Sequence, residues 1–277
     1  MSISVQVPCT DCDSVTIAFQ LVDDPKTSLL AWTTTPWTLP SNLGLCVHPD
    51  FEYVKIHDQT RDLNFILHKN LLTTVYKDPK KAPIKILETF KGNHLKGWRY
   101  VPLFDYFTKQ FEDRAFRVVT DKYVTSDSGT GIVHQAPAFG EDDHRIALAH
   151  NVIRLDEMPP CPIDDTGCFT DEVPDFKGLH VKVTFSLTFD DHCLHSIGGC
   201  RQGDLPQIES ERQAHCAFQL YALLSLLLEV CSSKNPHSRL IYHRSGTPLI
   251  YRAIPSWFVK VTPIVDQLVK ANSETRW

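Results

Sequence analysis

The stretch that decides the fold is Trp32–Asn42, WTTTPWTLPSN. It begins where a short apolar run, Leu29–Trp32, gives way to three consecutive threonines, and Pro36 follows them directly. Because β-branched residues favour strands and proline cannot donate to a strand ladder, the pattern predicts a strand that ends in a polar cluster at a sheet edge. A second segment about 100 residues later, Gly129–Asp143, reads GTGIVHQAPAFGEDD. Either segment alone is a weak signal, whereas the two in this order are specific.

Short apolar runs predict strands along much of the chain. The predicted strands lie in Met1–Asp24, Ser28–Trp32, Leu43–Val47, Glu52–Ile56, Asn64–Leu67, Ile84–Phe90, Phe116–Thr120, Ile132–Gln135 and Leu249–Val261. The turn His48-Pro49-Asp50 indicates that the strands on either side of it pair with each other. The predicted helices are Lys69–Tyr76, Glu141–Asn151, Ala217–Val230 and Ile264–Ala271. Many strands and few helices predict a barrel-like α/β or mostly β domain.

Composition excludes several classes of protein. The chain has 277 residues, of which 42% are hydrophobic and 22% charged, which predicts a soluble globular protein with one large domain or a core and an insertion. Nine cysteines in a chain of this length do not indicate a disulfide scaffold, and no signal peptide opens it, so free thiols in a reducing compartment are expected. The longest apolar run, Ala217–Val230, is interrupted by polar residues and falls short of the roughly 20 residues that a membrane span needs.

The net charge is -5, so the chain as a whole is not an electrostatic trap for nucleic acid. Lys77–Arg99 is a local exception, rich in lysine with few acidic residues. It is interpreted either as a solvated loop or as a contact to an RNA backbone.

Four segments together resemble one family: WTTTPWTLPSN, GTGIVHQAPAFGEDD, CPIDDTGCFT and TPLIYRAIPSWFVKV. They are similar to the editing domain of isoleucyl-tRNA synthetase, the connective-peptide insertion that hydrolyses mischarged tRNA, and more to its eukaryotic cytoplasmic form than to bacterial ones. The resemblance covers roughly Ser28–Lys182 and Arg244–Trp277. Sister domains of the valine and leucine enzymes usually carry an arginine where this chain has Pro36-Trp37, which favours the isoleucine branch.

Two departures from the family are visible. The segment Val183–Ser233 does not resemble it, where a short, charged, helix-rich linker is expected, and His243 stands where a tryptophan is expected. The resemblance therefore implies three parts: an editing core over 1–182, a diverged or inserted segment over 183–243, and a return strand and helix over 244–277 that lead toward a synthetic domain. No HIGH-type or KMSKS-type motif is present, so an excised domain that does not activate an amino acid is expected.

The resemblance implies the chemistry of post-transfer editing. The expected reaction is hydrolysis of the ester in valyl-tRNA(Ile), with the mischarged acceptor end and the remainder of the synthetase as partners, in the cytoplasm, with no membrane and no cofactor. Family members are thought to position a water molecule and to let the terminal ribose hydroxyl assist. One methylene is a small difference for a hydrophobic pocket to detect, so a second, small site that admits valine and excludes isoleucine is expected.

Roles follow residue by residue. Asp143 is expected to pair with the α-ammonium group of the aminoacyl ester, although an ordinary aspartate at a helix N-terminus is the simpler alternative. The hydroxyls of Thr33, Thr34 and Thr35 are expected to hold the terminal adenosine, the ester and the water; in a regular strand the first and third would face one side and the second the other. The alternative is that these threonines have no functional role and are present because β-branched residues favour strands.

The remaining site residues support the substrate. Thr38 and Asn42 are expected to buttress the loop, and the glycines of Gly129, Thr130 and Gly131 allow backbone N–H groups to approach a ligand closely. His134, at a strand end, is expected to contact the substrate amino acid and to limit the pocket; a satisfied core histidine is its alternative.

Metal binding is the main chemical alternative to this site. Asp190-Asp191-His192-Cys193 with His195 and Cys200 contains ligand types, and Cys9 and Cys12 form half of a zinc pattern, but neither has a convincing second pair, so no metal is expected. Two rival functions stay open. One is deacylation of another small amino acid such as threonine or a non-protein analogue, and the other is a tRNA-binding or scaffolding module without turnover.

Overall fold

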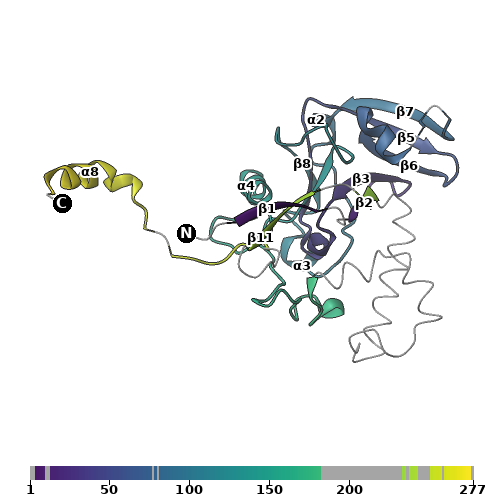
Figure 1. Cartoon of the computed structure of the whole chain (residues 1–277). Coiled ribbons are helices and arrows are strands. Elements are labelled where there is room, and N and C mark those ends of the chain that lie inside the picture. The colour runs from purple at the N-terminus through teal and green to yellow at the C-terminus, as the bar shows by residue number, and fades with distance from the viewer. Residues whose placement is uncertain are drawn as a thin grey trace.

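Within the described residues, nine strands form one branched sheet, and two further strands form a small separate sheet (Figure 1). The computed structural model describes residues 4–9, 13–76, 78–79, 81–181, 233–234, 237–242, 250–257 and 259–275. The strands are β1 Ser4–Cys9, β2 Asp13–Gln20, β3 Thr27–Thr33, β4 Gly44–Val47, β5 Glu52–Asp58, β6 Leu63–His68, β7 Ile84–Lys91, β8 Arg117–Thr120, β9 Ile132–Gln135, β10 Ser233–Lys234 and β11 His237–Tyr242. The large sheet has the order β7-β5-β6-β3-β9-β4-β8, with β2 and β10 beside β3.

The sheet branches at β3, the strand that leads into the threonines. β2 pairs antiparallel with β3 along its length, from Val15 opposite Thr33 onward. On the other edge, the first half of β3 pairs parallel with β6 and its end pairs parallel with β9. One edge of β3 therefore serves two strands, so the sheet divides into a barrel side and a wing of β6, β5 and β7.

The barrel side closes on itself through an irregular segment, residues 98–101. The Val101 N–H donates to the Gln20 carbonyl, 2.8 Å, at the end of β2. The Tyr100 N–H donates to the Phe116 carbonyl, 3.1 Å, and the Val118 N–H to the Trp98 carbonyl, 2.9 Å, along β8. The ring β2-β3-β9-β4-β8 is thus completed by backbone hydrogen bonds, which confirms the strand-rich, barrel-like fold predicted from the sequence.

Two apolar cores correspond to the two sides of the sheet. The larger core fills the barrel and includes fully buried aromatic side chains of Phe19, Tyr100 and Phe111. The smaller core lies on the wing and is formed by Ala18, Leu30, Val54, Ile56, Phe65 and Leu67. Neighbouring residues on β3, such as Leu29 and Leu30, enter different cores because successive side chains of a strand point to opposite faces.

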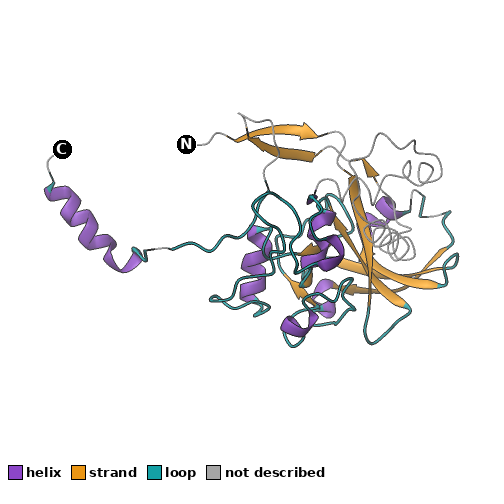
Figure 2. Ribbon diagram, turned by 90° about the horizontal axis from the view of Figure 1, so that it is seen from below, coloured by secondary structure: helices purple, strands orange, loops and turns teal. Residues whose placement is uncertain are grey.

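The short helices lie beside the barrel, as Figure 2 shows. They are α1 Leu72–Val75, α2 Gly92–Leu95, α3 Thr108–Phe111 and α4 Glu141–Ala149, with 3-10 turns η1 Pro36–Ser41, η2 Lys69–Leu71 and η3 Pro174–Phe176. The predicted helix at Lys69–Tyr76 is confirmed as η2 followed by α1, and the one at Glu141–Asn151 is confirmed as α4. No pattern in the sequence predicted α2 or α3, since a single turn has no measurable periodicity.

Two strand predictions are wrong. The strands β4 and β5 exist, but they do not pair with each other, because β4 lies between β8 and β9 while β5 lies between β6 and β7. The predicted strand Leu249–Val261 is irregular over its described residues 250–257 and 259–261. There Pro255 lacks a backbone donor, and no described strand runs beside the segment.

The C-terminal part extends away from the barrel. The helix α8 Val265–Glu274 follows the 3-10 turn η4 Thr262–Ile264, which confirms the predicted terminal helix. Figure 1 shows α8 at the end of an extended segment, apart from the sheet. Within the described ranges, no helix has the length and apolar character that a membrane span requires. The predicted helix Ala217–Val230 and nearly all of the unmatched segment Val183–Ser233 lie outside the described residues.

Candidate active site

The sheet brings the two sequence motifs side by side. At the end of β3, Trp32 is paired with Val133 of β9, so the threonine segment and the GTGIVHQ segment run parallel as neighbours. Beyond the strands, the Trp37 and Phe139 rings pack edge to face with centroids 5.0 Å apart. The two motifs thus meet in the sheet and again in the loops that follow it.

The threonine hydroxyls gather at the start of η1. Thr33, the last residue of β3, accepts a hydrogen bond from the Thr35 N–H at 3.1 Å, and the two hydroxyl oxygens are 3.4 Å apart. Thr33 and Thr35 therefore face the same side, as strand alternation predicts, although the strand ends before Thr34. Thr34 is half-buried, and its hydroxyl has no partner among the described residues. It is free to contact a ligand.

His134 lies inside the barrel in a fully bonded network. Its Nδ1 is 2.8 Å from Asn42 Nδ2, and its Nε2 is 2.9 Å from Thr38 Oγ1. Asn42 also donates to the Gly44 carbonyl, and Thr38 Oγ1 donates to the Thr35 carbonyl. The Asn42 amide nitrogen can only donate, so Nδ1 of the imidazole is the acceptor. The Thr38 hydroxyl proton already bonds to the Thr35 carbonyl, so Nε2–H is the donor to Thr38 Oγ1.

The environment of His134 fixes its charge. The side chain is 5% exposed, and burial lowers the pKa of His134 to about 3. The imidazole is therefore neutral at physiological pH, with both nitrogens occupied by protein groups. These contacts are those of a satisfied core histidine, the alternative role considered for His134. They tie the loop that carries Thr38 and Asn42 to β9.

The GTG turn packs closely against neighbouring strands. Gly129 and Gly131 have φ values of +73° and +74°, which favour glycine. A Cβ on Gly129 would come within 2.9 Å of the Trp32 ring, and one on Gly131 within 2.4 Å of His68 Cβ. Thr130 is buried and its carbonyl accepts from the His68 N–H at 2.8 Å. These three residues join the barrel to the wing and take no part in the network around His134.

Asp143 lies in the first turn of α4 and turns back toward the end of β9. Its Oδ2 accepts a hydrogen bond from the Ala136 N–H at 2.9 Å. The side chain is half-buried. Burial raises the pKa of Asp143 to about 6, against the opposing effects of hydrogen bonds from Ala136 and from the Gln135 side chain. At neutral pH the Asp143 carboxyl group is therefore mostly ionised. It lies in the helical turn that directly follows the loop whose Phe139 ring contacts Trp37.

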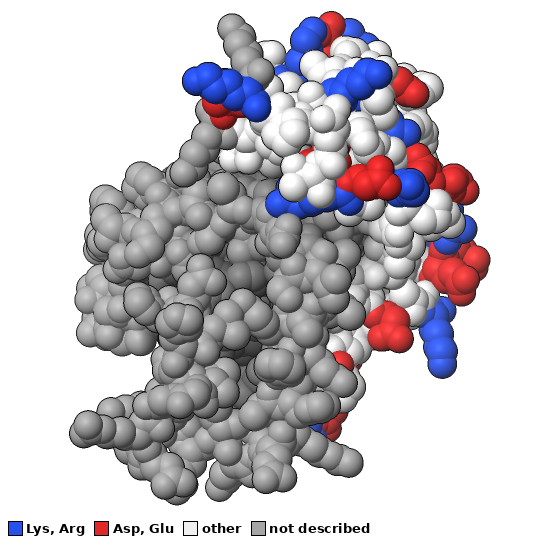
Figure 3. Space-filling model, turned by 90° about the vertical axis from the view of Figure 1, so that its right-hand side faces the viewer, with Lys and Arg blue, Asp and Glu red and all other residues white. Residues whose placement is uncertain are grey.

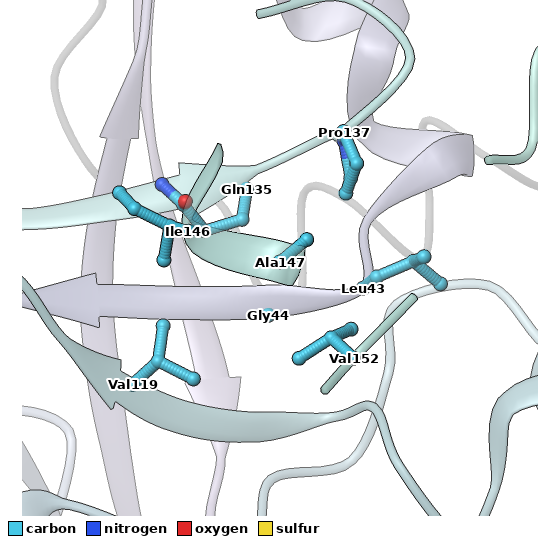
Figure 4. A pocket seen from close by; sticks show the side chains of 8 residues that line it. All are labelled: Leu43, Gly44, Val119, Gln135, Pro137, Ile146, Ala147 and Val152. Carbon is cyan, nitrogen blue, oxygen red and sulfur yellow. The ribbon is translucent and has the colours of Figure 1, made fainter. Parts of the chain in front are cut away.

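A small apolar cavity lies beneath α4 (Figure 4). It is lined by Leu43, Gly44, Val119, Gln135, Pro137, Ile146, Ala147 and Val152, and its volume of about 10 Å³ is the size of one water molecule. The Gln135 amide points toward Ile146 in this view. None of the threonines lines it, so it is not the substrate pocket.

Sequence reasoning missed three polar residues that complete these networks. The Tyr100 hydroxyl, fully buried, donates to Asn42 Oδ1 at 2.5 Å. The Gln135 amide donates to the Tyr123 hydroxyl at 2.5 Å. Gln135 lies inside a quoted motif, but its partners are distant in sequence, and no pattern signals that a lone tyrosine will be buried against an amide.

The basic segment Lys77–Arg99 forms a mixed surface. Lys81 pairs with Asp78, Lys91 donates to the Asp50 carbonyl, and Lys69 nearby pairs with Glu52. Figure 3 shows Lys and Arg side chains interspersed with Asp and Glu on the face that carries β7 and its neighbours. This surface favours the solvated interpretation, since a phosphate backbone would meet charges of both signs.

In the described part of the chain, no three His, Cys, Asp or Glu side chains lie together as a metal site would need. The cluster Asp190–Cys200 and Cys12 lie outside the described residues.

The chain is similar to several isoleucine–tRNA ligases. It is 47% identical over 264 residues to the cytoplasmic isoleucine–tRNA ligase of Saccharomyces cerevisiae and 45% identical over 264 residues to that of Mus musculus. These matches cover 95% of this chain but only 22% and 18% of the two ligases, so the chain spans about a fifth of the relatives it matches.

Other comparisons add less. No protein-family model matches the chain. Two solved structures, titled GlLeuRS-CP1 and the cytosolic leucyl-tRNA synthetase editing domain of P. knowlesi, match with TM-scores of 0.41 and 0.46 at 16% and 11% identity, covering 94% and 81% of this chain and 96% and 98% of theirs. Likeness at this level carries no inference. On the sequence relatives, the resemblance drawn from the motifs is confirmed: the chain belongs to the isoleucine–tRNA ligase family, as a segment of about a fifth of its members' length.

Proposed function

We propose that the chain is an editing domain that hydrolyses the ester of mischarged valyl-tRNA(Ile). The observation that carries this proposal is the Asp143 carboxylate, half-buried and held by the Ala136 N–H beside a loop that packs on the threonine segment. A fixed anion and a cluster of hydroxyls, carried by two segments that pack on each other, suit a substrate with a cationic amino group and a neutral ester. The isoleucine–tRNA ligase relatives support this choice of substrate.

Asp143 anchors the amino acid. Its carboxylate pairs with the α-ammonium group of the aminoacyl ester, and partial burial strengthens this pair relative to one in bulk water. Because the pKa of Asp143 is about 6, the anchor is charged at neutral pH and weakens in mild acid. Hydrolysis should therefore decline as pH falls through this value.

The threonines hold the reacting end. The free hydroxyl of Thr34 contacts the terminal adenosine or the ester, while Thr33 and Thr35 orient the attacking water through their paired hydroxyls. The water oxygen bonds to the ester carbonyl carbon, the bond to the ribose oxygen breaks, and the proton passes to that oxygen. The products are free valine and a tRNA with its terminal hydroxyl restored, and the neighbouring ribose hydroxyl assists the proton transfer.

His134 sets the size of the site through its partners. Its imidazole holds Thr38 and Asn42, which fix the path of the Thr35 loop. A rigid loop prevents the pocket from expanding, so valine enters and the larger isoleucine is excluded. The turn Gly129–Gly131 supports the same wall from the side of Trp32.

The partners of this domain are the acceptor end of the tRNA and the remainder of a full-length synthetase. The division into 1–182, 183–243 and 244–277 belongs to this proposal, with the last part leading back to the synthetic domain. The names of the relatives support a cytoplasmic location.

The test is deacylation of charged tRNA by the purified chain. Valyl-tRNA(Ile) is expected to be hydrolysed and isoleucyl-tRNA(Ile) to be spared. Asp143→Ala is expected to reduce the rate about 10-fold to 100-fold, the effect of losing a hydrogen bond to a charged group. Glu141→Ala, which removes an exposed carboxylate from the same helical turn, is the matched control and should leave the rate unchanged.

Three outcomes contradict the proposal in different ways. Equal losses in Asp143→Ala and Glu141→Ala would remove Asp143 from the site. Faster cleavage of threonyl-tRNA than of valyl-tRNA would change the substrate. Tight tRNA binding without any hydrolysis would indicate the non-catalytic tRNA-binding module instead.

A further inference from the structure

The turn Ala136–Phe139, between β9 and α4, connects the two parts of the proposed site. The Phe139 N–H donates to the Ala136 carbonyl at 2.9 Å, which closes the turn. At its start, the Ala136 N–H donates to the Asp143 carboxylate at 2.9 Å. At its end, the Phe139 ring packs edge to face on Trp37 of η1, which follows the threonines. The position of this turn therefore sets how the Asp143 carboxylate lies relative to the threonine loop.

A segment from the far end of the chain bonds to the middle of this turn. The Ala253 N–H donates to the Ala138 carbonyl at 2.6 Å. Ala138 is buried, and a buried carbonyl needs a partner within the protein. Ala253 belongs to the motif TPLIYRAIPSWFVKV, whose residues have no part in the site described above. The segment Ile250–Ala253, the strap, thus adds a third point of support to the turn.

Alternate residues attach the strap to the barrel. Ile250 packs on the large apolar core and lies against Gly167, where an added Cβ would be 3.3 Å from the Ile250 Cδ1 atom. Tyr251 is 58% exposed. The Arg252 side chain is only 22% exposed. This alternation is that of an extended chain with one face on the protein, since successive side chains point to opposite sides.

Arg252 fixes the strap with polar bonds. Its Nη1 donates to the Ile163 carbonyl at 2.8 Å, and its Nη2 pairs with the Asp165 carboxylate. Both acceptors lie in the motif CPIDDTGCFT. The Asp165 side chain is 91% exposed, so the ion pair by itself contributes little. The bond to Ile163, which is buried, is the stronger constraint because a charged donor meets a carbonyl shielded from water.

We propose that Arg252 is a positioning residue for the ester hydrolysis: it locks the strap, and the strap fixes the turn Ala136–Phe139 between the Asp143 carboxylate and the threonine loop. This inference rests on the proposed function of Asp143 as the anchor. Arg252 does not touch the substrate and acts through the N–H of its neighbour Ala253. Because Ile254 is already 61% exposed, the chain leaves the barrel directly after the strap, so the path toward the remainder of the synthetase begins at the wall of the site.

The test compares Arg252→Ala and Arg252→Lys with Arg114→Ala in the whole chain. Arg114 makes a two-point ion pair with Glu157 at 2.7 and 2.9 Å, and its side chain is also 22% exposed. It bonds to neither the strap nor the turn, so its variant reports the loss of a comparable arginine elsewhere in the fold. Arg252→Lys keeps a cationic donor but not the fork of the guanidinium, so it should retain part of the function.

A second pair of variants addresses the backbone bond itself. Ala253→Pro removes the N–H that donates to the Ala138 carbonyl. Tyr251→Pro is its control on the same strap, because the Tyr251 N–H makes no hydrogen bond to a described residue. The two prolines stiffen the strap alike, and only the first deletes the contact to the turn.

The first readout needs no substrate and follows amide hydrogen exchange by NMR. Arg252→Ala and Ala253→Pro are expected to speed exchange at Ala136 and Phe139 about tenfold relative to the His68 amide, which is bonded to the Thr130 carbonyl. A role in overall stability alone would speed all three amides equally, since global unfolding exposes them together. The exchange ratios should therefore stay at the parent value in Arg114→Ala and in Tyr251→Pro.

The second readout is the hydrolysis of valyl-adenosine. Arg252→Ala and Ala253→Pro are expected to lower kcat/KM about tenfold, with most of the loss in KM because a displaced Asp143 carboxylate binds the ammonium group less well. Arg252→Lys should fall between parent and Arg252→Ala. Arg114→Ala and Tyr251→Pro should match the parent.

Two results would overturn the inference. One is an exchange rate at Ala136, relative to His68, that is the same in Arg252→Ala and in the parent, which would show that the strap does not hold the turn. The other is faster local exchange with an unchanged kcat/KM, which would show that the position of the turn does not affect the reaction. If the parent hydrolyses nothing, the proposed function fails, whereas the exchange rates still decide whether Arg252 holds the turn.

Discussion

The Nε2–H of His134 donates to Thr38 Oγ1 at 2.9 Å, and this bond joins two segments that lie 96 residues apart in the sequence. Since the Thr38 hydroxyl donates a hydrogen bond to the Thr35 carbonyl, the histidine holds the threonine loop in place by a chain of two hydrogen bonds. The residue that the sequence nominated as a gate for the substrate is thus bonded to protein groups on both nitrogens.

His134→Ala is therefore expected to destabilise the fold. It leaves Asn42 and Thr38 with unpaired buried groups and opens a cavity, so a loss of about 2–4 kcal/mol in the free energy of unfolding is expected. Urea denaturation measures it, with the half-buried His144→Ala as the control. A variant of normal stability that cleaves isoleucyl-tRNA would instead identify His134 as a gate that touches the substrate.

The buried neutral imidazole also predicts a pH dependence of stability. The pKa of His134 is about 3 in the folded chain against an ordinary value of 6.5, so its contribution is fully present above pH 6.5 and is lost as pH falls toward 3. The free energy of unfolding should fall by up to about 1.4 kcal/mol per pH unit in this window. In the Asp143→Asn background, which removes the other shifted group of the site, His134→Gln should flatten this slope. An unchanged slope would assign it to other groups.

The shifted pKa of Asp143 predicts a pH dependence of stability of the opposite sign. Its folded pKa of about 6 lies above the ordinary 3.8, so the folded state is favoured at low pH and that contribution is lost as pH rises through 6. Asp143→Asn carries no charge to bury and is expected to be about 1–3 kcal/mol more stable than the parent at pH 8. The difference should vanish below about pH 4. Thermal midpoints at both pH values measure it, and an Asn variant that is less stable at pH 8 would show that the charged form is the stabilised one.

Gly131→Ala is expected to be severely destabilising. Its φ is +74°, and the new Cβ would lie 2.4 Å from His68 Cβ, so both the backbone and a packed neighbour resist the change. The matched control is Gly97→Ala, with φ +86° and no atom within 4 Å of the added Cβ. The control should cost only the backbone strain, about 1 kcal/mol, and Gly131→Ala clearly more. Equal losses of stability in the two variants would mean that β6, the strand that ends at His68, shifts to accommodate the added Cβ at little cost.

Tyr100→Phe tests the closure of the barrel. The hydroxyl is the donor to Asn42 Oδ1, and its loss leaves a buried acceptor unpaired at almost unchanged volume. A loss of about 1–3 kcal/mol in the free energy of unfolding is expected. Tyr76→Phe, which removes a half-buried hydroxyl bonded to Asp58 on the wing, provides the comparison. If valyl-ester hydrolysis falls in Tyr100→Phe alone, the loop of Asn42 is held in its active position by this bond.

The sequence alone determined where most strands and the family motifs lie. β9 begins and ends at the residues that the pattern indicated, and β3 extends the predicted Ser28–Trp32 by one residue at each end. α4 begins at Glu141, as its acidic first turn predicted. These features are local: side-chain alternation, proline and the charges of a helix turn act on residues close in sequence. The family motifs are of the same kind, since they are contiguous strings.

Tertiary structure decided which strands are neighbours and which polar groups meet. β4 and β5 follow each other in the chain, yet barrel closure separates them, because residues 98–101 complete a ring of hydrogen bonds that excludes β5. The same closure buries His134 with Asn42 and Tyr100, and brings Gln135 to Tyr123. Short-range patterns carry no information on such pairings. They are set by long-range burial, where every enclosed donor must find an acceptor wherever in the chain it lies.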